Sequence, residues 1–196
     1  IFVFITTLAG SYLLMRKIGL SKLLSLVSAV FASFSGYFIV QMTHLNLLQS
    51  FSFIPWAILF TEKLITEKWG RPVLWLGFIL AQMILVGYPQ TFINSVFILI
   101  IYSTCSNWNK RIQNLMKISA GAIIAILISA IQLIPLVELV KQSDTLSSAS
   151  NQRYIHPLPI KNLLTIFYPF IFGNPANGTY SYHGKGWPIF WENLLY

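Results

Sequence analysis

The sequence predicts an all-α polytopic membrane protein with about six transmembrane helices. Its 196 residues are 56% hydrophobic and only 9% charged, and the mean hydropathy is +0.68. Soluble domains carry about 25% charged residues, so the composition excludes an ordinary globular protein. A second observation is that apolar runs of near-spanning length alternate with short polar turns, which is typical of a chain that crosses a bilayer repeatedly.

Six apolar runs are the predicted spans, and they cover residues 1–15, 23–40, 47–65, 73–86, 91–104 and 118–140. Pro55 predicts a kink in the third run. Pro89 suits the first turn of the fifth helix, because its missing N–H costs nothing there. The first run is shorter than the roughly 20 residues that a crossing needs, and residue 1 is Ile rather than Met. We therefore interpret the chain as a fragment of a larger chain.

Basic residues are distributed unevenly between the turns. Segments 16–22, 62–71 and 106–117 each hold three Lys or Arg, whereas turns 41–50 and 87–90 hold none. Under the positive-inside rule the basic segments lie in the cytoplasm, and the two uncharged turns lie outside. The net charge of +8 is then a signal of topology, and no nucleic-acid partner is predicted. We expect a multi-pass membrane protein whose basic segments face the cytoplasm.

The chain changes character after residue 140. Residues 1–140 form the predicted transmembrane helical region, 141–190 an extracytoplasmic loop, and 191–196 the start of a further transmembrane helix. Within the loop, an apolar stretch near 162–172 contains Pro169 and is too short to span. It predicts a short interfacial helix on the outer surface.

Polar and charged side chains gather on the outer side of this topology. Charged groups near membrane depth are costly and are usually functional or paired. The candidate catalytic carboxylates are Glu138 and Glu192, and the candidate substrate-binding residues are His44, Asn46, Gln90, Arg153, Tyr154 and His156. The mix of cation, phenol and imidazole around Arg153 suits a phosphate or diphosphate at a membrane surface.

Each of these residues also has a purely structural interpretation. Glu138 could pair with Lys141 one turn later, and Glu192 could be a plain interfacial charge. His44 with Asn46 could cap a helical turn, Gln90 could be a helix-start residue, and residues 153–156 could be a solvated loop. No phosphate loop, zinc pattern or nucleophile elbow occurs, and the single cysteine, Cys105, has no partner. No cofactor is therefore predicted, and a divalent metal stays open.

Several segments together resemble a known family. They are THLNLLQSFSFIPWAILFTEKL, GYPQTFINSVFILIIY, IQLIPLVELVKQS, LPIKNLLTIFYPFIFGNP and WENLLY, in that order, between about Ser35 and Tyr196. The ordered set is similar to the bacterial membrane protein YfhO family, within the C-type glycosyltransferase superfamily. The resemblance implies sugar transfer from a polyprenyl-phosphate donor to an envelope polymer or lipid acceptor on the outer membrane face.

One feature departs from that superfamily. Its enzymes place an acidic catalytic residue in the first outside loop, but nothing acidic precedes Glu62 here, and Glu62 falls on the cytoplasmic side. We expect that residue in a loop upstream of Ile1. Two other functions stay open from the sequence. One is a transporter or flippase of an envelope precursor, which also needs polar groups facing a cavity. The other is a non-catalytic membrane scaffold.

Overall fold

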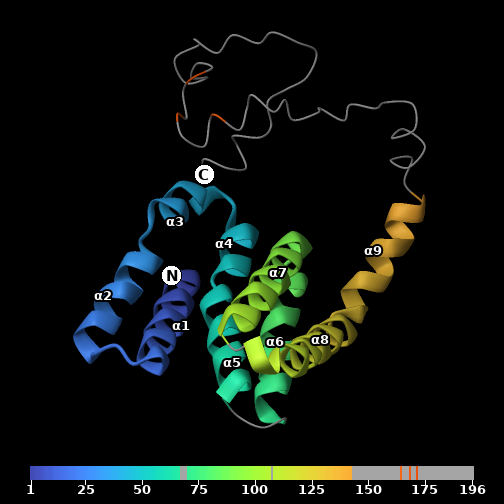
Figure 1. Ribbon diagram of the computed structural model, residues 1–196. Coiled ribbons are helices and arrows are strands. Elements are labelled where there is room, and N and C mark those ends of the chain that lie inside the picture. Colours follow the sequence, from blue (N-terminus) through green and yellow to red (C-terminus); the bar gives the residue numbers. More distant parts are fainter. Residues whose placement is uncertain (67–69, 107, 143–163, 165–167, 169–170, 172–196) are drawn as a thin grey trace. The chain divides into compact units, whose positions relative to one another are not determined.

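The computed structural model describes residues 1–66, 70–106 and 108–142, with single residues at 164, 168 and 171. These residues form helices and the connections between them, with no strand in the described ranges (Figure 1). The predicted all-α class is confirmed for this part of the chain. The chain divides into two units, Ile1–Leu136 and Val137–Tyr196, and the helical core belongs to the first.

The first two helices, α1 (Phe2–Ile18) and α2 (Lys22–Ser33), form an antiparallel pair (Figure 1). Gly19 ends α1 in the left-handed region at φ 106°, where glycine has no Cβ penalty. Ser21 then starts α2, and its hydroxyl accepts a hydrogen bond from the Leu24 N–H. The buried positions of the pair are mostly small, which lets the two backbones approach closely.

The predicted third span is two helices rather than one kinked helix. After α3 (Gly36–Val40) and a 3₁₀ turn (Gln41–Thr43), α4 covers Leu45–Phe51 and α5 covers Ile54–Thr66. The break falls at residues 52–53, and Pro55 is the second residue of α5. The break is sharper than the expected kink, and it lies in the turn before Pro55, because proline cannot donate a backbone hydrogen bond to the Phe51 carbonyl.

Helix α6 (Arg71–Leu85) is the most buried element of the first unit. It packs against α5, α7 (Pro89–Ser106) and α8 (Arg111–Ile128). Pro89 begins α7 as predicted. Glycines bring α6 and α8 close together: a Cβ on Gly77 would lie 2.6 Å from Ile124 Cγ2 and 3.0 Å from the Gly121 carbonyl oxygen.

The last predicted span also differs from the structure. α8 begins at Arg111, seven residues before the expected start at 118, and it ends at Ile128; α9 follows as Ala130–Gln142. The Ser129 hydroxyl donates to the Ala81 carbonyl oxygen at 3.3 Å, which ties the break to α6. Lys117, which was assigned to a basic loop, lies inside α8 and is only 4% exposed.

Within the described ranges, two helical stretches are long and apolar enough to cross a membrane, Lys22–Thr43 and Arg111–Ile128. A shorter apolar helix covers Arg71–Leu85. Helix α7 has 18 residues, as α8 does, but is less apolar, and the other described helices of the first unit are shorter. Six membrane crossings therefore stay a prediction.

Candidate functional site

The turn around His44 has its shape set by backbone hydrogen bonds. The His44 N–H donates to the Gln41 carbonyl oxygen at 2.8 Å, and the His44 carbonyl accepts the Leu48 N–H at 3.1 Å. The imidazole makes no capping bond to α4. His44 and Asn46 are both exposed. The turn thus presents an imidazole and a carboxamide outward. The His44 side chain does not cap α4, so the start of this helix is held by backbone hydrogen bonds.

The turn between α6 and α7 lies beside the His44 turn. Gly87 adopts φ 90°, and its N–H donates to the Ile84 carbonyl oxygen at 2.9 Å. A Cβ on Gly87 would lie 4.0 Å from the Asn46 amide nitrogen. The two uncharged turns, which are far apart in sequence, are therefore neighbours in the first unit.

Contacts below the turns hold them together. The Ser50 hydroxyl, fully buried in α4, donates to the Met83 carbonyl oxygen of α6 at 3.4 Å. The Tyr37 ring packs against Phe51 with centroids 4.9 Å apart, and α4 also contacts α7. The exposed polar turns thus lie on a packed base.

Gln90 adds a second carboxamide at this end. It is exposed in the first turn of α7, directly after Pro89. Among the predicted site residues, His44, Asn46 and Gln90 therefore lie at the same end of the first unit. Their side chains offer both donors and acceptors without a formal charge, which suits hydrogen bonding to sugar hydroxyls or to phosphate oxygens.

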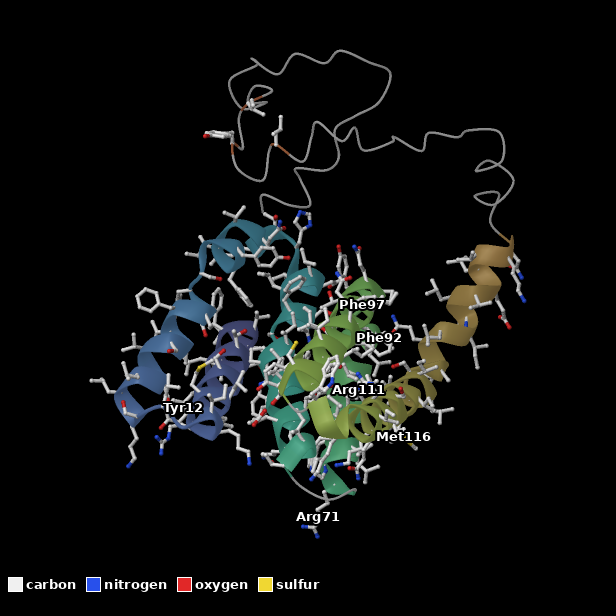
Figure 2. All side chains as sticks on the ribbon, viewed as in Figure 1. Tyr12, Arg71, Phe92, Phe97, Arg111 and Met116 are labelled. Atoms are coloured by element: carbon white, nitrogen blue, oxygen red, sulfur yellow. The ribbon has the colours of Figure 1, made fainter. Side chains whose placement is uncertain are left out.

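The opposite end of the unit carries the cations. α1 ends with Arg16 and Lys17, Lys63 lies in the last turn of α5, and Arg71 begins α6. Figure 2 shows the Arg71 side chain extending away from this end. The charge asymmetry of the sequence is thus an asymmetry between the two ends of the folded unit.

The remaining predicted residues are not brought to this site by the described structure. Glu138 is exposed on the part of α9 that belongs to the second unit, and no ion pair joins it to Lys141. Glu192, Arg153, Tyr154 and His156 lie outside the described residues. Within the described ranges, no three His, Cys, Asp or Glu side chains are placed to hold a metal ion.

Sequence reasoning missed a set of buried and half-buried polar groups near the basic end. The Lys117 ammonium donates to the Leu64 carbonyl oxygen at 2.8 Å, and the Tyr102 hydroxyl donates to a Glu62 carboxylate oxygen at 2.8 Å. Asn114 is 1% exposed. Asn114 and Lys117 begin a stripe of buried α8 residues at helical spacing. That spacing indicates a buried helix face. The neighbouring cations Lys110 and Arg111 instead favoured a basic loop.

Comparison with known proteins identifies a family. A family model described as "Bacterial membrane protein YfhO" matches residues 2–181. The match starts well before Ser35, the approximate start of the resemblance noted in the sequence, so it takes in the first helix pair. No curated protein and no solved structure matches the chain.

Proposed function

Because this chain belongs to the bacterial membrane protein YfhO family, we propose that it is part of an integral membrane glycosyltransferase. The enzyme transfers a sugar from a polyprenyl-phosphate donor to a cell-envelope acceptor on the outer face of the membrane. The observation that supports this best is the meeting of two uncharged polar turns, with Asn46 beside Gly87. The basic residues of α1, α5 and α6 lie at the other end, as the positive-inside rule requires of an outward-facing site.

Six membrane crossings are compatible with the helix lengths if two consecutive helices together make one crossing. Residues 45 to 66, which form α4, the break at 52–53 and α5, extend at most about 33 Å at 1.5 Å per residue. This length matches a hydrocarbon core of about 30 Å. In this arrangement residues 1–140 are the transmembrane region, 141–190 are extracytoplasmic, and 191–196 start a further helix.

The proposed chemistry is a displacement at the anomeric carbon of the sugar. The acceptor hydroxyl oxygen forms the new bond to that carbon, and the bond from the carbon to the donor phosphate oxygen breaks. The phosphate leaves with the electron pair, and a carboxylate takes the hydroxyl proton. In this proposal Glu138 and Glu192 are the available carboxylates, Arg153 and His156 stabilise the departing phosphate, and His44, Asn46, Gln90 and Tyr154 bind the sugar or phosphate.

A transfer assay tests this function. The full-length protein is purified and reconstituted in liposomes that contain polyprenyl-phosphate hexose with a radiolabelled sugar, and transfer to added envelope acceptors is measured. Gln90→Ala should lower the initial rate about tenfold, since about 1.4 kcal/mol is within the range of one hydrogen bond. Gln113→Ala is the matched control, because Gln113 is equally exposed in the first turn of α8. Equal transfer rates for the two variants would show that Gln90 does not bind the substrate.

A transporter is the second candidate, and one observation favours it. The hydroxyls of Thr91 and Ser95 on α7 are buried, and neither has a hydrogen-bond partner in the described part of the chain. The two residues are one helical turn apart, so both lie on one face of α7 within the bundle. Polar groups inside a bundle are typical of a substrate path. In the same liposomes, a transporter would move the labelled lipid between leaflets without forming a glycosylated acceptor.

A further inference from the structure

Four aromatic rings form a continuous row across α5 and α6. The centroids are 6.5 Å apart between Trp56 and Phe60, 6.0 Å between Phe60 and Trp75, and 6.1 Å between Trp75 and Phe78. The first two pairs are stacked and the third is edge-on. The Trp75 ring is 52% exposed and Phe78 is 45% exposed. This aromatic row therefore faces the surroundings of the bundle.

The row is held in place at its α1 side. The Trp56 indole N–H donates to the Thr6 carbonyl oxygen of α1 at 2.9 Å. The same ring occupies the space that a side chain on Gly10 would take, since a Cβ there would lie 2.6 Å from it. The row on α5 and α6 is thus anchored to α1 and preformed, and little side-chain entropy is lost when a ligand binds to it.

The edge of the row nearest the basic end of the unit carries positive charge, over the second ring. The Lys63 ammonium lies 5.1 Å above the centroid of the Phe60 ring. α1 and α5 run in the same direction in Figure 1, so Arg16 and Lys17 end α1 at the same end of the unit as Lys63. The neighbouring carboxylate of Glu62 is engaged elsewhere, by the hydroxyl of Tyr102 on α7.

We propose that the aromatic row binds one anionic phospholipid, with a hydrocarbon chain along the rings and the phosphate beside Lys63. Charge selects this occupant, because a cation at the end of an apolar surface matches an anionic headgroup with an apolar tail. The length of the row fits within one leaflet of the bilayer. Lys63 and Trp56 are separated by about 10 Å along the helix, and half of a hydrocarbon core is about 15 Å. The assignment of this lipid to the cytoplasmic leaflet rests on the proposed orientation of the protein. The binding site itself does not depend on that orientation.

Native mass spectrometry of the purified protein tests the site. The protein is incubated with equal amounts of phosphatidylglycerol and phosphatidylcholine, and the lipids that stay bound are counted. The wild type should retain one phosphatidylglycerol in preference to phosphatidylcholine. Lys63→Gln should lower that retention about tenfold, whereas Lys22→Gln should leave it unchanged. Lys22 is the matched control because it is an exposed lysine whose ammonium lies over no ring in the described structure.

A second pair of variants tests the rings. Trp75→Leu should weaken retention of the lipid, and Phe97→Leu should not, because Phe97 is 67% exposed on α7 and outside the row (Figure 2). Circular dichroism confirms that each variant is folded. Equal retention of the two lipids by the wild type, or equal effects of Lys63→Gln and Lys22→Gln, would overturn the proposal. So would a dimer that Trp75→Leu dissociates, since a second copy would then cover the rings.

Discussion

At Gly10, α1 has no side chain, and the Trp56 ring fills the space. Gly10→Ala places a Cβ 2.6 Å from that ring, so the indole must move and its bond to the Thr6 carbonyl oxygen lengthens. We expect the free energy of unfolding, measured by detergent titration, to fall by about 1 to 3 kcal/mol. Gly36→Ala is the control, because nothing lies within 4 Å of a Cβ there. Equal losses for both variants would contradict this packing.

Lys117 satisfies the Leu64 carbonyl, one of the last carbonyls of α5, which lack partners within their own helix. Lys117→Met keeps most of the stem and removes the donor. The free energy of unfolding should fall by about 1 to 3 kcal/mol, as is usual when a buried acceptor loses its partner. Lys22→Met removes the same charge from an exposed position and should change stability by less than about 0.5 kcal/mol. A Lys117→Met variant as stable as Lys22→Met would show that this bond contributes nothing.

Single residues were predictable from the sequence where local geometry decides their position. Pro89 starts α7 as expected, because a missing N–H is harmless in a first turn. Lys117 was wrongly assigned to a loop, because its burial depends on a carbonyl of α5 that lies far away in sequence. No local pattern reports such a partner.

At the scale of helices, the crossing of α6 and α8 depends on two glycines. Gly77→Ala should destabilise the protein, because its Cβ would lie 2.6 Å from Ile124 Cγ2. Ile124→Ala removes that atom, so the double variant should lose less stability than the two single losses combined, by about 1 kcal/mol. Rescue is partial, since alanine keeps the Cβ of residue 124 at 2.8 Å and the Gly121 carbonyl oxygen stays 3.0 Å away.

The control for this cycle is Ile123→Ala. Ile123 is 58% exposed on the same helix and does not face Gly77, so its effect should add to that of Gly77→Ala. Unfolding titrations of the single and double variants give both coupling energies. Additive effects for the Gly77–Ile124 pair would mean that the two helices do not cross as closely as described.

The apolar runs predicted the helices better than they predicted their ends. Pro55 suggested a kink within one helix, and the chain breaks fully in the turn before it, at residues 52–53. The run 118–140 suggested one helix, but α8 starts at Arg111 and a break at Ser129 is tied to α6 through its hydroxyl. Hydropathy reports apolar length, whereas helix breaks depend on contacts with other helices.

For the whole molecule, the distribution of Lys and Arg along the sequence was the main basis for predicting which turns lie at the same end. The uncharged turns were expected on one side, and in the structure Asn46 lies beside Gly87. Membership in the YfhO family is confirmed by the match over residues 2–181. The grouping of Glu138 and the residues after 142 with this site stays a prediction, because contacts between distant segments do not follow from composition.

The central claim is that the turns carrying His44, Asn46 and Gln90 face outward while the basic end faces the cytoplasm. Cys105 is the one cysteine of the chain, and it is exposed at the basic end of α7. Intact cells are treated with a membrane-impermeant maleimide, once with the native chain and once with Gln90→Cys in a Cys105→Ser background. The account predicts that position 90 is labelled in intact cells and that Cys105 is labelled only after permeabilisation. Labelling of Cys105 in intact cells, with position 90 protected, would contradict the orientation and the outward-facing site.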